Sequence, residues 1–141
     1  LCGGSQMLCL RLYDPDALEH HEPTSEVGLG YINDEVVYQA PKLLTSGTYS
    51  IFGQDIAGYE IHYGRMASNP LFYTSETVCG THIHGVFDDD NFRRHYFRTI
   101  NPNYQGYCYA DYRESQIQGF ADQVGAIINI DNLLEKLVTT R

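Results

Sequence analysis

The most informative segment is Leu1-Cys2-Gly3-Gly4-Ser5-Gln6-Met7-Leu8, which places a cysteine before two glycines and an expected helix. This order is typical of a nucleophile elbow, a tight turn that needs small neighbours. A helix start favours the thiolate form of Cys2, because its free N–H groups and dipole attract negative charge. The Gly3 amide would face an oxyanion on a substrate that Cys2 attacks. The alternative is a buried structural cysteine in a glycine-rich turn, which suits a lone free cysteine.

The pattern beyond this stretch mixes helices and strands. We expect a helix from Ser5 to Tyr13 that ends before Asp14-Pro15, since the residue before proline avoids the helical region. Runs of β-branched and aromatic residues predict strands at Glu35 to Tyr38, Thr48 to Phe52, Gly58 to Tyr63 and Val78 to Val86. Apolar stripes predict three later helices, one starting near Asn91 behind the capping residues Asp88 to Asp90, and two over Ile117 to Ile128 and Ile130 to Val138. The class is therefore α/β or α+β.

Composition excludes several classes of protein. A chain of 141 residues suits one domain, and 43% hydrophobic with 19% charged residues is typical of a globular protein. The formal charge of −9 argues against nucleic-acid binding, because an acidic surface repels phosphates. No apolar run reaches the roughly 18 residues of a membrane span, and no signal peptide is visible. The four cysteines form no C-x-x-C pair, so we expect a reduced, cytoplasmic protein.

Two further motifs carry polar side chains on expected strands. In Gly80-Thr81-His82-Ile83-His84-Gly85-Val86-Phe87, the two histidines would share one strand face. They are either a satisfied pair at a strand end or part of a zinc site, but no third ligand has an obvious spacing, so we expect no metal. In Gly58-Tyr59-Glu60-Ile61-His62-Tyr63-Gly64-Arg65, Glu60 and His62 share a face. Such a face is either exposed or lines a site.

In this order the motifs resemble the glutaminase domain of the cobyric acid synthase family. The matching residues are Cys2 to Leu8, Asp14-Pro15, Gly28-Leu29-Gly30, Gly58 to Arg65 and Gly80 to Phe87. The resemblance implies an α/β fold of the class I glutamine amidotransferase type, a flavodoxin-like open sheet flanked by helices. Residues 1–141 would form the C-terminal portion of that domain, truncated just before the elbow, with its first strands missing. A fragment of this kind should be a poor glutaminase by itself, since the entering strand and a second oxyanion donor would precede Leu1.

The resemblance also implies roles for individual residues. Cys2 matches the nucleophile and His84 the catalytic histidine, while Gly3 and Gln6 match positions that hold glutamine. We expect Glu60 and His62 to border the same pocket and to orient His84 or contact glutamine. The implied partners are L-glutamine, an N-terminal ATP-dependent synthetase domain of the same polypeptide and, through that domain, a corrinoid. ATP and Mg are expected only in the synthetase domain, and no cofactor in this chain.

Some residues depart from the family pattern. Ser5 and His82 replace usual tyrosines, and Cys9 replaces a usual glycine. Many class I glutaminases carry a glutamate two residues after the histidine, but Val86 stands there, so a Cys–His dyad is the simplest interpretation. The alternatives are the glutaminase of cobyrinate diamide synthase or of the lipid II amidating enzyme, a binding module in which Cys2 and His84 are relics, and a metal-binding module.

Overall fold

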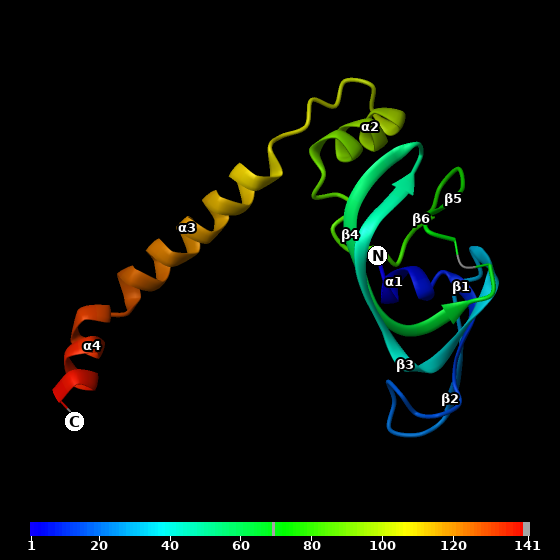
Figure 1. Cartoon of the computed structure of the whole chain (residues 1–141), viewed down its shortest axis with the longest axis horizontal. Helices are drawn as coiled ribbons and strands as arrows, with labels where there is room; N and C mark the ends of the chain where they lie inside the picture. Colours follow the sequence, from blue (N-terminus) through cyan, green and yellow to red (C-terminus); the bar gives the residue numbers. More distant parts are fainter. Residues whose placement is uncertain (69, 140–141) are drawn as a thin grey trace.

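The computed structural model describes residues 1–68 and 70–139 and shows a curved mixed sheet with helices (Figure 1). The sheet has the order β2-β1-β3-β4, in which β1 and β3 run parallel and the other neighbours are antiparallel. Its strands are β1 (Cys9–Asp14), β2 (Thr24–Val27), β3 (Ile32–Ile51) and β4 (Gln54–Met66), and a separate pair is formed by β5 (Tyr73–Thr74) and β6 (Cys79–Gly80). The helices are α1 (Gly3–Gln6), α2 (Asp90–Ile100), α3 (Tyr109–Ile127) and α4 (Ile130–Thr139). The expected α/β class is confirmed.

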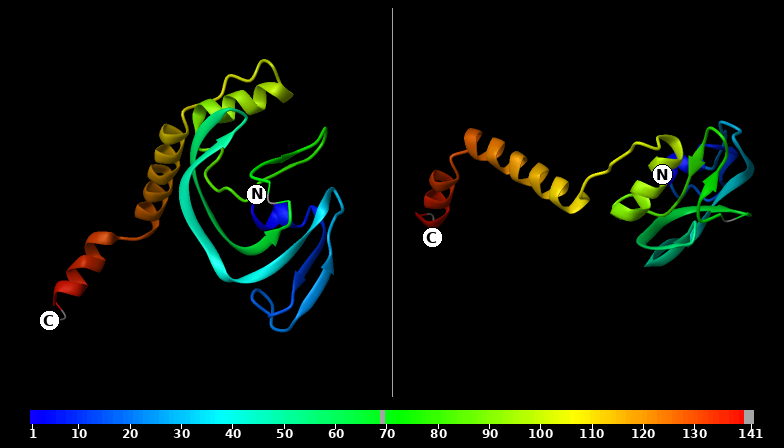
Figure 2. Two further views of the ribbon diagram at one scale, coloured as in Figure 1. Left: turned by 45° about the vertical axis from the view of Figure 1, so that its right-hand side comes forward. Right: turned by 90° about the horizontal axis from the view of Figure 1, so that it is seen from above.

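The long hairpin β3–β4 forms the wall of the molecule. Its turn has two residues between paired Ile51 and Gln54, and both Phe52 (φ 52°) and Gly53 (φ 73°) have positive φ. This is the geometry of a type I′ turn, whose twist matches that of the flanking strands. The hairpin curves around α1 in Figure 1 and in the left-hand view of Figure 2, so β4 faces the segment that carries Cys2.

Two apolar clusters hold the sheet and the histidine segment (Gly80 to Phe87) together. One consists of Cys9, Ile32, Val36, Tyr38 and Met66. The other consists of Ile51, Ile56, Ile83, Val86 and Phe92. Ile83 and Val86 are 1% and 0% exposed, so the residues on either side of His84 are fixed in a core. Burying each of these side chains contributes about 1.5–3 kcal/mol of transfer free energy.

The predicted helix from Ser5 to Tyr13 is wrong beyond its first residues. The helix α1 ends at Gln6, and β1 begins at Cys9. Leu8, Leu10 and Leu12 alternate along the sequence, which is the period of a strand rather than of a helix. The strand is fixed by pairing with β2 on one side and β3 on the other.

The predicted strand from Val78 to Val86 is mostly absent. Only Cys79–Gly80 form a strand, and His84 forms one isolated bridge with Tyr59. The side chain of Thr81 explains the break, because its hydroxyl donates to the Leu71 carbonyl (2.5 Å) and accepts from the Ile83 amide (3.1 Å). A threonine hydroxyl of this kind competes with a sheet ladder for the backbone. The expectation that His82 and His84 share one strand face is therefore wrong.

The helix α2 is capped as predicted. The side chain of Asp89 accepts a hydrogen bond from the Phe92 amide at 2.7 Å, and Asn101 ends the helix. Asp90 accepts from both Arg93 (2.7 Å) and the Tyr109 amide (2.9 Å). The capping carboxylates thus join the start of α2 to the start of α3.

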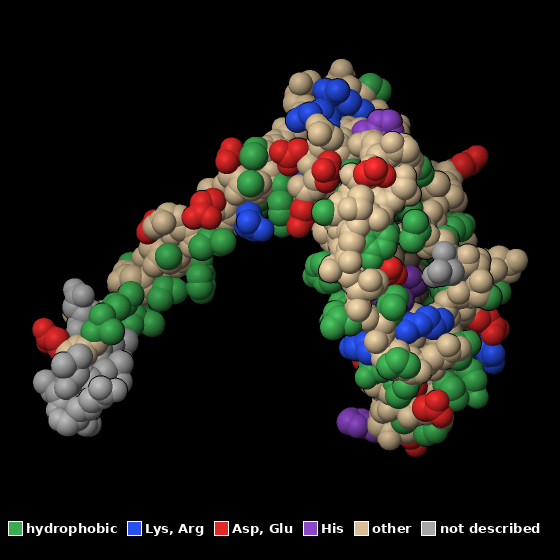
Figure 3. Space-filling model, viewed as in Figure 1, with side chains coloured by type: hydrophobic (Ala, Val, Ile, Leu, Met, Phe, Trp, Pro, Cys, Tyr) green, Lys and Arg blue, Asp and Glu red, His purple; other side chains and the backbone are tan. Residues whose placement is uncertain are grey.

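The two closing helices form as predicted but lie apart from the sheet. α3 and α4 extend away from the body in all views (Figures 1 and 2), and α3 contains no buried residue. Its stripe residues Ile117 and Phe120 are 55% and 69% exposed, and apolar side chains gather along α3 (Figure 3). None of the described helices has the length and apolarity to cross a membrane.

Candidate functional site

Cys2 occupies a strained turn directly before α1. Its backbone has φ 48° and ψ −117°, a conformation that costs a residue with a side chain about 1–3 kcal/mol. The Cys2 amide donates to the Thr81 carbonyl (2.8 Å) and the Gly4 amide to the Leu1 carbonyl (3.0 Å). Within the described residues, the intervening Gly3 amide makes no hydrogen bond. This is the geometry of a nucleophile elbow with a free donor beside the thiol.

Four of the six predicted site residues line one small cavity. The cavity has a volume of about 190 Å³, and its lining is Cys2, Gly3, Gln6, Glu19, Tyr38, Ile61, His62 and Tyr63. The Cys2 Sγ lies 3.9 Å from the Ile61 carbonyl oxygen on β4. The thiol therefore opens into a partly polar space between α1 and the hairpin.

Gln6 forms a fixed part of the cavity wall. It is 3% exposed, and its Oε1 accepts a hydrogen bond from the Tyr38 hydroxyl at 3.1 Å. A side chain at Gly64 would bring a Cβ within 2.5 Å of the Gln6 Nε2 and 2.7 Å of the Val36 Cγ1. The absence of a side chain at Gly64 therefore lets β4 approach Gln6 closely.

Glu60 lies behind His62 rather than in the cavity lining. The His62 Nε2 is 3.1 Å from the Glu60 Oε2, and its Nδ1 is 2.6 Å from the Gly64 carbonyl oxygen. Both ring nitrogens are engaged, and His62 is 6% exposed. The pair thus holds one ring rigidly against the Cys2 cavity.

His82 stacks on His62 and is kept neutral. The ring centroids are 4.4 Å apart at an interplanar angle of 26°. Burial, and to a smaller extent the neighbouring charge of His62, lower the pKa of His82 from 6.5 to about 4. Among the described residues its buried Nε2 has no hydrogen-bond partner.

The depressed pKa of His82 predicts an acid-sensitive fold. As the pH falls from 6.5 towards 4, the unfolded chain takes up this proton before the folded chain does, so the folded state loses stability. We expect the free energy of unfolding to fall by about 2 kcal/mol more in the parent than in His82→Phe between pH 7 and pH 4.5. Urea unfolding at the two pH values measures this. An equal fall in both proteins would contradict it.

His84 lies beyond the cavity lining but on the segment that is tied to Cys2. Its backbone pairs with Tyr59 through two hydrogen bonds, of 2.8 and 3.2 Å, and its ring stacks on the Tyr59 ring at 4.8 Å. Three residues earlier on the same segment lies Thr81, whose carbonyl oxygen accepts a hydrogen bond from the Cys2 amide. The structure thus places His84 three residues along the chain from the contact that fixes Cys2.

Sequence reasoning missed Glu19 and Tyr38, which line the Cys2 cavity. The buried Asp14 positions Glu19, because its carboxylate accepts the amides of Leu18 (2.8 Å) and Glu19 (2.9 Å). Burial alone would raise the pKa of Asp14, but hydrogen bonds from these amides and from His20 hold it below its usual value. Only the Asp14-Pro15 turn signal pointed to this region.

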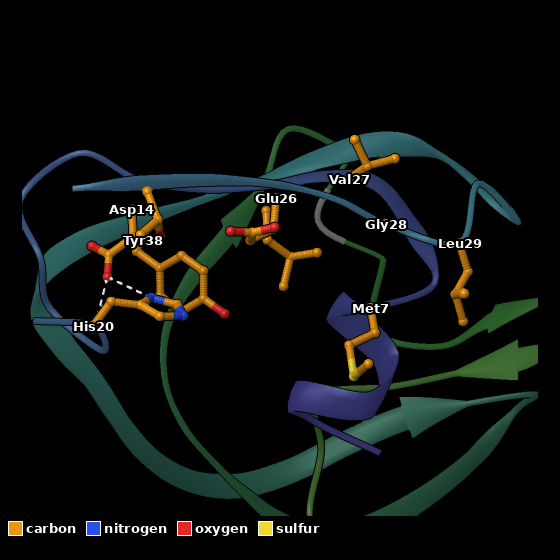
Figure 4. A pocket seen from close by; sticks show the side chains of 10 residues that line it. Met7, Asp14, His20, Glu26, Val27, Gly28, Leu29 and Tyr38 are labelled. Atoms are coloured by element: carbon orange, nitrogen blue, oxygen red, sulfur yellow. Dashed lines mark hydrogen bonds and ion pairs between the residues drawn. The ribbon is translucent and has the colours of Figure 1, made fainter. Parts of the chain in front are cut away.

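Tyr38 also borders a second cavity, of about 250 Å³ (Figure 4). Figure 4 shows the Asp14–His20 hydrogen bond next to Tyr38 at one end and Met7 and Leu29 at the other. The two cavities therefore share Tyr38 as a dividing side chain, and Gln6 is its hydrogen-bond partner.

The sequence is similar to known proteins of one family. Residues 1–92 match the model of the CobB/CobQ-like glutamine amidotransferase domain. The chain is 39% identical over 137 residues to a cobyric acid synthase of Acinetobacter baylyi, covering 97% of this chain and 30% of that protein. Cobyric acid synthases of Granulibacter bethesdensis and Cutibacterium acnes are each 32% identical, with 95% of this chain and 31% of each relative covered. The chain thus spans about a third of the length of these relatives.

Proposed function

Because this chain belongs to the CobB/CobQ-like glutamine amidotransferase family, we propose that it hydrolyses glutamine through a dyad of Cys2 and His84. The observation that carries the proposal is the conformation of Cys2, a positive-φ cysteine before a helix whose thiol opens into a polar cavity. Strain of this kind persists where the surroundings impose it, and it is concentrated at reactive sites. The Leu1 to Leu8 motif and the Gly80 to Phe87 motif meet at the hydrogen bond between Cys2 and Thr81. This contact supports the pairing of Cys2 with His84.

The reaction follows from the groups present. The Cys2 thiolate attacks the side-chain amide carbon of glutamine, and the Gly3 amide donates to the oxyanion. The His84 imidazolium gives its proton to the leaving nitrogen, so ammonia departs and a thioester remains. Neutral His84 then takes a proton from water, which attacks the thioester. Glutamate leaves, and the thiolate and the imidazolium are restored.

We assign glutamine binding to the remaining predicted residues. Gly3, Gln6 and His62 border the cavity, and Glu60 holds the His62 ring in place. A cavity of about 190 Å³ suits a small polar substrate rather than a polymer. The hydrogen bond from Tyr38 leaves the Gln6 amide group fixed in orientation, which favours a specific contact with substrate.

The relatives suggest where the ammonia goes. The three that were compared are cobyric acid synthases, and this chain matches about a third of each. We propose that residues 1–141 act as the glutaminase portion of such an enzyme. An ATP-dependent synthetase domain of the same polypeptide would use the ammonia to amidate carboxylates of a corrinoid in cobalamin biosynthesis.

Glutamine hydrolysis tests the proposed function directly. The full natural polypeptide should release glutamate and ammonia in equal amounts from L-glutamine, and asparagine should be a poor substrate because its amide carbon would not reach Cys2. Both products are measured by coupled enzymatic assay. A folded polypeptide that releases neither, with or without ATP and a corrinoid acceptor, contradicts the proposal.

A further inference from the structure

Among residues 1–68 and 70–139, no carboxylate is hydrogen-bonded to the His84 ring. The position two residues later is Val86, which is 0% exposed and packed in a core cluster. Glu60 on the facing strand is engaged with His62 at 3.1 Å. Within the described residues, the buried Nε2 of His84 has no hydrogen-bond partner. A catalytic imidazole nevertheless needs a fixed ring plane, so another group must supply the orientation.

Tyr59 is the group that contacts the ring plane. The two rings lie 4.8 Å apart with an interplanar angle of 11°, which is a parallel stack. The separation and the angle suit an attractive aromatic contact. Such a face also attracts a cation, so it stabilises the imidazolium form of a histidine more than the neutral form.

The backbone around this stack is built for close approach. Tyr59 and His84 exchange two backbone hydrogen bonds, as an isolated antiparallel bridge. A Cβ on Gly58 would lie 2.5 Å from the Ile83 Cγ2 and 2.8 Å from the His84 carbonyl oxygen. Gly85 has φ +81°, a conformation that favours glycine. The glycines on either side thus allow the two rings to meet, while Tyr59 itself is 46% exposed and contributes little to the core.

We propose that Tyr59 is a positioning residue for His84 and takes the orienting role that a carboxylate has in other catalytic histidine sites. The inference rests on the proposed dyad. The Tyr59 ring fixes the ring plane of His84 through the stack, and the phenolic hydroxyl has no part in this. Loss of the ring should therefore lower kcat and leave KM for glutamine nearly unchanged.

The test uses ring-removing and ring-preserving variants in the full natural polypeptide. Tyr59→Leu should lower kcat by roughly 10- to 100-fold, with KM within about threefold of the parent. Tyr59→Phe should keep kcat within about threefold, because the stack is preserved. Tyr13→Leu is the matched control, since Tyr13 is a partly exposed tyrosine (37%) on β1.

The outcomes separate this inference from the proposed function. If His84→Ala is inactive while Tyr59→Leu keeps the parent kcat, the dyad stands and the positioning role fails. If Tyr59→Phe is as slow as Tyr59→Leu, the hydroxyl rather than the ring matters, and the inference is overturned. Tyr59→Thr, which retains a strand-forming residue, replaces Tyr59→Leu if circular dichroism shows the latter unfolded. An active His84→Ala protein would overturn the dyad and this inference together.

Discussion

Cys2→Ala should lower kcat for glutamate release by roughly 10⁴-fold or more in the full natural polypeptide, because removal of a nucleophile leaves only binding and oxyanion stabilisation. Alanine has the same Cβ as cysteine and meets the same backbone strain at φ 48°. The substitution therefore removes the sulfur without changing the conformational cost of the turn. The rate is measured as glutamate formed at saturating glutamine.

Two other thiols provide the controls for this prediction. Cys79 and Cys108 are exposed and free, and neither lines the Cys2 cavity. Cys79→Ser and Cys108→Ser should keep the parent rate within about twofold, in line with ordinary surface substitutions. A Cys2→Ala protein that stays within tenfold of the parent would remove Cys2 from the reaction.

His84→Ala has the second largest expected effect. It should lower kcat by about 10²- to 10⁴-fold, the usual contribution of a general acid–base. His82→Phe is the matched control, because His82 lies two residues away on the same segment and stacks on His62 instead of Tyr59. That control should retain activity within tenfold.

Substitutions at His82 and His84 should also differ in their effects on stability and on hydrolysis. His82 is 6% exposed and its loss affects the fold, whereas His84 is partly exposed and its ring contact is with the half-exposed Tyr59. Unfolding by urea should therefore show a larger change for His82→Ala than for His84→Ala. If instead His82→Phe abolishes hydrolysis and His84→Ala does not, the base has been assigned to the wrong histidine.

Local signals predicted those elements whose geometry is fixed by neighbouring residues. Asp89 caps α2 because a carboxylate at a helix start accepts amide hydrogen bonds whatever the rest of the fold does. That helix ends at Asn101 for a similarly local reason, because the residue before a proline avoids the helical region. The turn at Cys2 follows from Cys2-Gly3-Gly4 in the same local way.

Distant partners decided the parts that local signals missed. Residues 9–13 alternate as a strand does, but the run is short, and pairing with both β2 and β3 fixes it as a strand. The hydroxyl of Thr81 diverts the histidine segment from the sheet by bonding to Leu71, ten residues away. Tyr38 reaches the site through Gln6, 32 residues away in sequence. Such contacts leave no pattern in the sequence near either partner.

The glycines of the Gly58 to Arg65 motif are also explained by distant contacts. Gly58 begins the strand predicted over Gly58 to Tyr63 and Gly64 follows it, whereas both glycines lie inside β4. Each lies where a Cβ would collide, at Gly58 with the histidine segment and at Gly64 with Gln6. The block around Glu60 is thus shaped by its approach to both halves of the site.

The pH dependence of Cys2 alkylation is the most direct test of the Cys2–His84 dyad. Iodoacetamide labelling of the full natural polypeptide, followed by mass spectrometry of the Cys2 peptide, should show rapid reaction that persists down to about pH 6, because an imidazolium partner stabilises the thiolate. In His84→Ala the reaction at pH 6 should be slower by at least tenfold, while Cys79 and Cys108 should react equally in both proteins. Identical Cys2 labelling curves for the parent and His84→Ala would contradict the dyad.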